Sequence, residues 1–285
     1  MKQKIALFSD IHGNLTALEA VIADSKGLEA TDYWVLGDVL MHGGGASEIF
    51  ELLNSLNPSV WVKGNWDDLL LVVLNQKDDI DVEDASDVYV TRLGMNLLSR
   101  LTEENLKQLE MRPMCETKTV NGLKFSISHN LPDKNFGGAL YPTAEQEGFD
   151  SLFVSETTDV AVYGHIHHQL MRYSSSEQLI INPGSIGYPF NHRKSLRQAG
   201  YAHYAILEID VDGALEVNFK QVKYDVAKEL KRSKEINLPY LQVYKETLAK
   251  GTTRTHDLEF LSKINKEYGY KEEVITYLQY EQSNG

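Results

Sequence analysis

The chain of 285 residues has 42% hydrophobic and 24% charged residues, a composition that excludes the low-complexity and disulfide-rich classes. Its net charge of −13 excludes a long nucleic acid as partner, because gripping one requires a basic surface. The apolar runs fall short of the roughly 20 residues of a membrane helix, and the single cysteine, Cys115, permits no internal disulfide. We therefore expect a cytoplasmic protein without membrane contact.

The first two-thirds of the chain alternates strand-like and helix-like segments. Residues 5–8 and 33–36 are apolar and strand-like, and a segment with hydrophobic residues at helical spacing follows each of them. This order favours parallel pairing of the strands over an all-β sandwich. Residues 67–109 read as mostly helical and acidic.

Strand signals dominate from residue 116 onward. Residues 116–119 and 123–128 flank Asn121-Gly122, which predicts a β-hairpin with an Asn-Gly turn. Further strand-like runs lie at residues 160–163, 179–181, 201–209 and 215–222. Two sheets, or one large mixed sheet, flanked by helices would account for this pattern.

The last part of the chain is helical in character, with apolar stripes typical of amphipathic helices. We expect a main domain over residues 1–224 and a C-terminal helical extension over residues 225–285. The apolar stripes predict that the extension packs on the main domain or on a second copy of the chain, which would make a homo-oligomer.

Five clusters of polar side chains each directly follow one of the apolar runs. They are Asp10-Ile11-His12, Gly37-Asp38, Gly64-Asn65-Trp66-Asp67, His129 and Gly164-His165-Ile166-His167. Open α/β sheets bind ligands at the carboxyl ends of their strands, so we expect one site here. Asp, Asn and His side chains suit manganese, iron or zinc, and no thiolate accompanies them.

Seven of these side chains are candidate metal ligands, which is too many for one tetrahedral ion. They are Asp10, His12, Asp38, Asn65, His129, His165 and His167. Alternation at a strand end is expected to point both ligands of each D-x-H or H-x-H cluster to one side. Two ions that share a carboxylate clamp the attacking and leaving oxygens of a phosphoryl displacement, and they lower the pKa of bound water to about 7.

The order D-x-H, G-D, G-N-x-D, a lone His and G-H-x-H resembles the signature of the calcineurin-like metallophosphoesterases, over residues 4–222. Residues 9–14 and 182–185 look like the bacterial branch, which contains small phosphodiesterases and diadenosine tetraphosphate hydrolases. The resemblance implies an α/β fold, a four-layer αββα sandwich of two mixed β-sheets flanked by helices. It also implies two metal ions, for which manganese and iron are expected and zinc is an alternative.

The resemblance further implies how the ligands are divided between the two ions. One ion would be held by Asp10, His12, Asp38 and His167, and the other by Asp38, Asn65, His129 and His165. A hydroxide that bridges the two ions would attack the phosphorus. Asp38, Asn65 and Asp67 are the expected catalytic residues, and residues 182–185 are expected to support the metal-binding histidines.

One position departs from the family pattern. Many members have His where this chain has Trp66, and that His is thought to contact substrate and protonate the leaving group, oriented by the residue equivalent to Asp67. General acid catalysis contributes typically 10²–10⁴-fold, so its loss favours stable leaving groups such as nucleotides or polyphosphates. His42, His168, His192 or a water could supply the missing acid.

Three other residues are candidate substrate contacts besides Asn65. Trp66 is either a core anchor or a flat surface for a nucleobase. Asn14 is either a turn residue or a phosphate contact. Arg193 follows a strand near the expected site, although an arginine on a loop is more often simply solvated.

The expected function is hydrolysis of small phosphodiesters or phosphoanhydrides, with a nucleotide as the anionic substrate. Diadenosine tetraphosphate, cleaved asymmetrically to AMP and ATP, is the particular substrate that the resemblance and Trp66 favour. A phosphoprotein or phosphomonoester phosphatase on the same centre is the alternative activity. A non-catalytic interaction scaffold is the alternative class, against which the complete ligand set counts.

Overall fold

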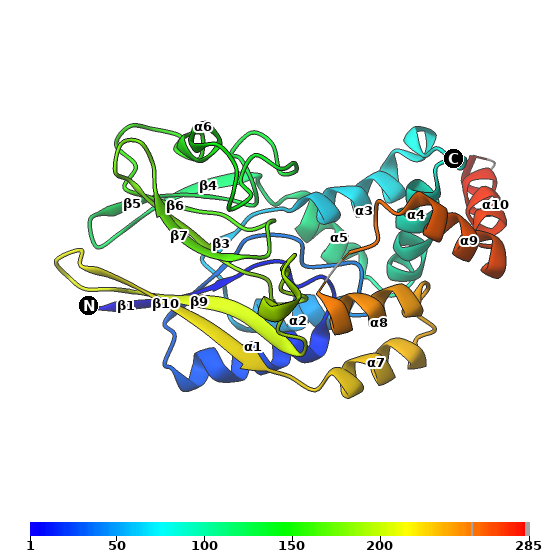
Figure 1. The fold of residues 1–285 in the computed structure, drawn as a ribbon, viewed down its shortest axis with the longest axis horizontal. Helices are drawn as coiled ribbons and strands as arrows, with labels where there is room; N and C mark the ends of the chain where they lie inside the picture. Colours follow the sequence, from blue (N-terminus) through cyan, green and yellow to red (C-terminus); the bar gives the residue numbers. More distant parts are fainter. Residues whose placement is uncertain (252, 283–285) are drawn as a thin grey trace.

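Two five-stranded β-sheets form the centre of the computed structural model, which describes residues 1–251 and 253–282 (Figure 1). The strands of the first sheet lie in the order β10-β9-β1-β2-β3. Their bounds are Gln3–Phe8 (β1), Asp32–Val35 (β2), Val60–Trp61 (β3), Tyr201–Ile209 (β9) and Leu215–Lys223 (β10). Strands β1, β2 and β3 are parallel, whereas β9 runs antiparallel to both β1 and β10, so the sheet is mixed.

The second sheet has the order β4-β5-β6-β8-β7 and is also mixed. Its strands are Cys115–Val120 (β4), Leu123–Ser128 (β5), Val160–Val162 (β6), Gln169–Tyr173 (β7) and Leu179–Pro183 (β8). Asn121 and Gly122 both have positive φ at the turn between β4 and β5, which confirms the predicted hairpin. The sequence did not predict β7, because this edge strand leaves Met171 and Tyr173 exposed and lacks a buried alternation.

The two sheets pack face to face through a shared core. On β1, Ile5 and Leu7 point between the sheets, whereas Ala6 and Phe8 face the helices on the other side. From the second sheet, Phe125 and other side chains of β5 and β6 enter the same layer. This alternation is the period-two pattern of a strand that is buried on both faces.

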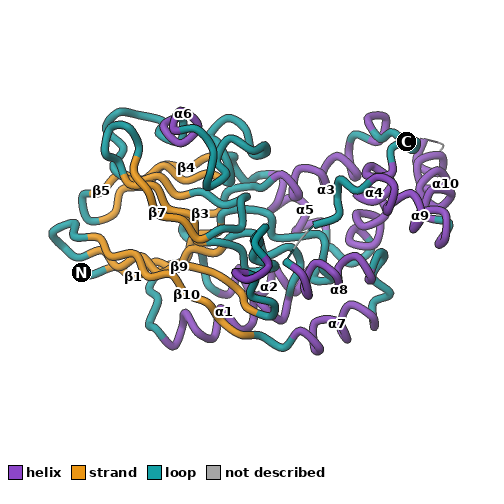
Figure 2. Tube along the Cα trace, viewed as in Figure 1, coloured by secondary structure: helices purple, strands orange, loops and turns teal. Residues whose placement is uncertain are grey.

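Helices cover the outer face of each sheet, so the four-layer αββα sandwich is confirmed (Figure 2). The helices α1 (Leu15–Gly27) and α2 (Ser47–Ser55) pack on the first sheet. The layer over the second sheet is thinner and consists of the short helix α6 (Gln146–Asp150) and loops. The sequence did not predict α6, since five residues are too few for a helical repeat to show.

The expected helical region is also present, and in the chain it lies between β3 and β4. It comprises α3 (Asn65–Asn75), the 3₁₀ turn Lys77–Asp79, α4 (Ala85–Leu98) and α5 (Glu103–Glu110). Helices α3 and α4 extend beyond the sheets on the side where the C-terminal helices lie (Figure 1).

Four helices make up the C-terminal part of the described chain. They are α7 (Val226–Glu235), α8 (Leu241–Lys250), α9 (Leu258–Tyr268) and α10 (Tyr270–Gln282). Helix α7 packs on α1, whereas α9 and α10 pack on α4. Leu238, Tyr244 and Leu261 join the same hydrophobic core as Phe8 of β1. The domain boundary at residue 224 and the formation of a homo-oligomer stay predictions. No described helix has the length and hydropathy of a membrane span.

Candidate metal centre and substrate cavity

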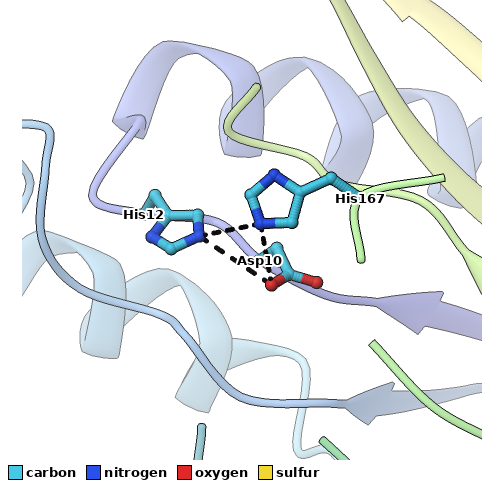
Figure 3. Close-up of side chains that lie close together, drawn as sticks. All are labelled: Asp10, His12 and His167. Carbon is cyan, nitrogen blue, oxygen red and sulfur yellow. Dashed lines mark hydrogen bonds and ion pairs between the residues drawn. The ribbon is translucent and has the colours of Figure 1, made fainter. Parts of the chain in front are cut away.

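All five polar clusters lie at one edge of the sandwich, where β1, β2, β3, β5 and β6 end. Six of the seven predicted ligands form two compact groups there. The groups are Asp10, His12 and His167 (Figure 3), and Asp38, His129 and His165. The ligand atoms within each group lie within 4.8 Å of one another. This division matches the one that the family resemblance implied.

The first group is built around a carboxylate with one free oxygen. Asp10 Oδ2 accepts hydrogen bonds from Ser9 Oγ (2.5 Å) and from the His165 backbone N–H (3.0 Å). The buried Oδ1 atom has no hydrogen-bond donor in the part of the chain that the structure describes, and it lies 3.1 Å from His167 Nε2 and 3.8 Å from His12 Nε2 (Figure 3). An unpartnered buried carboxylate oxygen between imidazole nitrogens suits a cation.

Backbone carbonyl groups orient three of the imidazole rings. The Nδ1 atoms of these rings lie 2.6–2.9 Å from carbonyl oxygens, in the pairs His12–Met41, His129–Leu36 and His167–Tyr188. A carbonyl accepts only from an N–H group, so Nδ1 carries the hydrogen and the lone pair of Nε2 faces the site. Metal-binding histidines are commonly fixed in this way.

Asp38 belongs to the second group and also faces His12 of the first group. Its Oδ2 atom is 3.2 Å from His129 Nε2 and 3.7 Å from His12 Nε2. Asn65 Oδ1 is 3.2 Å from His129 Nε2, and the His165 ring is 5.2 Å from the His129 ring. The residues therefore fit two ions that share the carboxylate of Asp38. Which metal they select stays a prediction.

The backbone at these ligands differs from the expected extension of the strands. Asp10, His12, Asp38, His165 and His167 all have φ between 51° and 64°, a left-handed conformation that is uncommon outside glycine. Strand alternation is therefore the wrong explanation for the side-chain directions. The left-handed turns place Asp10 and His12 in one group but send His165 and His167 to different groups.

Two glycines allow the ligand-bearing loops to approach each other closely. A Cβ atom on Gly64 would lie 2.1 Å from Asp38 Oδ1, and one on Gly164 would lie 2.1 Å from Ser9 Oγ. Real Cβ atoms do not approach other atoms so closely. The G-N-x-D and G-H-x-H clusters therefore need glycine for contact with a neighbouring loop.

Residues 182–185 support the site without contributing a ligand, as the sequence predicted. Asn182 Nδ2 donates to the carbonyl oxygen of Gly164 at 2.6 Å. Ser185 Oγ donates to the carbonyl oxygen of Asp10 at 2.8 Å. These bonds join the loop after β8 to the ligand-bearing loops of both sheets.

Asp67 forms hydrogen bonds with the backbone of two loops. Its buried carboxylate accepts hydrogen bonds from the backbone N–H groups of Asp38 (2.8 Å), Val39 (3.1 Å) and Gly64 (3.0 Å). Burial and the negative charge of Asp38 raise the pKa of Asp67 to about 7. Asp67 thus holds the loops after β2 and β3 together, and it does not orient a proton donor at position 66.

A cavity of about 360 Å³ opens beside the ligands. The ligands Asp38, Asn65, His165 and His167 line one side of it, together with His42, Trp66 and Tyr188. Another part of the lining comes from Ser86, Asp87 and Val90 of α4 and from Thr253, Thr255 and His256 of the loop before α9. Sequence reasoning missed this part, because its residues lie far from the ligand clusters and carry no metal-binding pattern.

Two predicted substrate contacts do not fit their positions. Asn14 is fully buried and caps α1: its Oδ1 accepts from Ala17 N–H, and its Nδ2 donates to Gly187 O and Tyr224 Oη. The turn role is therefore favoured for Asn14, since its polar atoms are already engaged. Arg193 is exposed and lies outside the cavity lining that the structure describes.

The charges of the site determine how it takes up a proton when no metal is present. Burial lowers the pKa of His129, but the carboxylates of Asp38 and Asp10 outweigh this effect and raise that pKa to about 10. Burial likewise lowers the pKa of His167, but the charge of Asp10 and its hydrogen bond to the ring outweigh this effect, so that pKa is raised. Burial and the positive charge of His129 lower the pKa of His165 to about 4.

We expect manganese binding to the metal-free protein at pH 7.5 to release protons, because a ligating imidazole must be neutral. Affinity should rise as the pH rises toward about 10, where His129 loses its proton. The effect of pH on stability has the opposite sign. Protonated His129 stabilises the metal-free fold fully below its unfolded pKa of about 6.5, and this contribution is lost as the pH rises through its folded pKa of about 10. Calorimetry in two buffers of different ionisation enthalpy measures the protons, and a value of zero would contradict the assignment.

Two stacked mixed sheets with two candidate metal-binding groups at the ends of their strands define the metallophosphoesterase fold. The profile of the calcineurin-like phosphoesterase superfamily domain matches residues 3–212. The chain therefore belongs to this superfamily, whose members use a dinuclear metal centre.

Individual relatives are similar over most of the chain. An uncharacterized protein of Methanocaldococcus jannaschii, MJ0912, is 27% identical over 252 residues, which cover 84% of this chain and 95% of the relative. A metallophosphoesterase from Sphaerobacter thermophilus, known from a crystal structure, has 26% sequence identity to this chain. The TM-score is 0.66, and the match covers 88% of this chain and 100% of that one. The hypothetical protein PH1004 from Pyrococcus horikoshii shares the fold at 19% identity, with a TM-score of 0.69 and coverage of 88% and 99%.

Proposed function

We propose that this protein hydrolyses phosphodiester or phosphoanhydride bonds at a centre of two metal ions. The supporting observation is that two ligand groups converge with the Asp38 carboxylate between them. Two ions held there would withdraw charge from the phosphoryl group and supply hydroxide from water at neutral pH. The proposed ligands are Asp10, His12, Asp38, Asn65, His129, His165 and His167.

The chain's own residues would position the substrate. Asn65 lines the cavity, so its side-chain amide can contact a phosphoryl oxygen as well as a metal ion. The half-buried ring of Trp66 lines the cavity too, and aromatic rings bind nucleobases by stacking. We propose a nucleotide as the substrate on this basis. A cytoplasmic location remains the expectation from the single cysteine.

Trp66 also bears on the choice of leaving group. Its indole cannot act as an acid, so a leaving group that is already a stable anion is favoured. Diadenosine tetraphosphate, cleaved to AMP and ATP, is the particular anhydride that we propose. The described lining contains no Lys or Arg, and Asp87 adds a negative charge. We therefore expect turnover of the tetraphosphate to be slower than that of a diester with a single charge.

Hydrolysis of bis(4-nitrophenyl) phosphate by the manganese-loaded protein should exceed that of 4-nitrophenyl phosphate by about 10-fold or more in kcat/KM. The diester has one charge and needs no proton donor, whereas the monoester brings a second negative charge into a cavity whose described lining has no Lys or Arg. Release of nitrophenolate measures both rates. Chromatography of a diadenosine tetraphosphate digest should show AMP and ATP.

The alternatives give different results in the same assays. A strong preference for the monoester would contradict the interpretation of Trp66 and indicate a phosphatase. Two ADP as products would contradict asymmetric cleavage. If the metal-loaded protein hydrolysed none of these substrates, a non-catalytic scaffold would be the better description.

A further inference from the structure

His42 is a buried histidine in the cavity wall that the proposed metal centre does not use. It lies in the loop after β2, is 5% exposed and lines the cavity beside Trp66 and Tyr188. Its ring centroid lies 4.0 Å from that of Trp66, in a T-shaped arrangement, and 5.5 Å from that of Tyr188. These contacts hold the ring in one place.

One ring nitrogen of His42 is engaged and the other is not. Nδ1 lies 2.8 Å from the hydroxyl of Tyr89 on α4, whose side chain is 2% exposed. Nε2 is buried and has no hydrogen-bond partner among the described residues. A buried polar atom without a partner costs free energy, so its retention beside a cavity points to a ligand that satisfies it.

Tyr89 determines which nitrogen carries the hydrogen. If its hydroxyl donates to Nδ1, then Nε2–H is the single unsatisfied group of the pair. If Nδ1–H donated instead, Nε2 and the hydroxyl hydrogen of Tyr89 would both lack a partner among the described residues. The first arrangement leaves fewer hydrogen-bonding groups without a partner.

We propose that His42 is a substrate-binding residue whose Nε2–H donates a hydrogen bond to an oxygen of the bound phosphate ester, and that Tyr89 is the positioning residue that fixes this tautomer. This inference rests on the proposed phosphoester hydrolysis. The two ring nitrogens of an imidazole point in roughly opposite directions, so Nε2 faces away from α4. His42 thus supplies an N–H donor beside Trp66, in a cavity whose described lining has no Lys or Arg.

The test uses the manganese-loaded full chain. We expect His42→Ala to lower kcat/KM for bis(4-nitrophenyl) phosphate by about 10- to 100-fold, as for a lost hydrogen bond to a charged group. Binding of inorganic phosphate, followed by calorimetry, should weaken by a similar factor. His42→Gln keeps an N–H donor and should retain more activity than His42→Ala. The metal content should remain at the wild-type value in both variants.

Tyr89→Phe keeps the packing but removes the hydroxyl. We expect a smaller loss of about 3- to 10-fold, together with a change in the nitrogen chemical shifts of the His42 ring that reports a mixed tautomer. A purely structural role of Tyr89 would not move these shifts. Tyr173→Phe is the matched control, because Tyr173 is exposed and lies outside the described lining, and its kcat/KM should equal that of the wild type.

The proposal is overturned if His42→Ala binds phosphate and hydrolyses the diester within about twofold of the wild type. It is also overturned if the loss of activity follows a loss of bound metal, since His42 would then act through the metal ligands. Failure of the wild type to hydrolyse any phosphoester would refute the proposed function instead. Phosphate binding by the His42 variants would still decide this inference.

Discussion

Replacing Asp38 with Asn is expected to lower hydrolysis of bis(4-nitrophenyl) phosphate by a factor on the order of 10³ and to remove bound manganese. Asp38 Oδ2 faces imidazoles of both ligand groups, at 3.2 Å from His129 Nε2 and 3.7 Å from His12 Nε2. An amide cannot supply the shared negative charge there. Elemental analysis and the rate of nitrophenolate release are the measurements.

The substitution should leave the fold intact, because the amide oxygen of Asn can still accept the 2.8 Å hydrogen bond that Asp38 Oδ1 receives from the Trp66 N–H. Circular dichroism of the metal-free protein tests this point. Asp212→Asn is the matched control, since Asp212 is exposed in the turn between β9 and β10. A fully active Asp38→Asn variant with wild-type metal content would refute the two-metal proposal.

Gly64→Ala is expected to lower the free energy of unfolding by about 3 kcal/mol and activity by a factor on the order of 10². The added Cβ would lie 2.1 Å from Asp38 Oδ1 and 2.4 Å from the Asp38 backbone nitrogen. The backbone of Asp38 cannot yield easily, because Asp67 holds it by a 2.8 Å hydrogen bond. Denaturant unfolding and metal content are the measurements.

Gly27→Ala is the control for this exchange. Gly27 is the last residue of α1, and a Cβ there would meet nothing within 4 Å. Alanine has the higher helix propensity, so this variant should be as stable as the wild type or more stable by up to about 1 kcal/mol. Equal behaviour of the two glycine variants would show that contact with Asp38 is not what requires glycine at position 64.

The loops after β2 and β3 act as one unit in this protein. Asp67 binds backbone N–H groups from both loops, and Gly64 allows them to approach. The same unit carries the ligand Asp38 at one end and His42 at the other. This is why a carboxylate is needed at position 67 even though position 66 holds no proton donor.

Much of the site was predictable because its ligands directly follow apolar runs. Buried strands can be recognised in a sequence by their hydrophobic residues, and the carboxyl ends of parallel strands meet at one edge of a sheet. Asp10, Asp38 and His129 could therefore be assigned to one site before any coordinates. The hairpin around Asn121-Gly122 was predictable from turn chemistry, since both residues tolerate positive φ.

The partition of the ligands was a different matter. His165 and His167 are two residues apart, yet left-handed turns send them to different groups. The residue pattern alone could not show this, because those turns are stabilised by contacts between the two sheets, such as the bond from the His165 N–H to Asp10 Oδ2. For Asn14 the sequence left a turn residue and a phosphate contact open, and Gly187 and Tyr224 from distant segments engage its amide.

The sequence by itself thus determined the set of candidate ligands and the order of motifs on which the resemblance to the family rests, since these depend on residues adjacent in the chain. That resemblance implied the layered architecture and the division of the ligands. Only the tertiary structure decided how the ligand-bearing loops turn, how Tyr89 holds His42, and that the loop before α9 lines the cavity. Those features depend on packing between segments up to about 200 residues apart in the chain. That packing cannot be predicted from the spacing or the type of the residues.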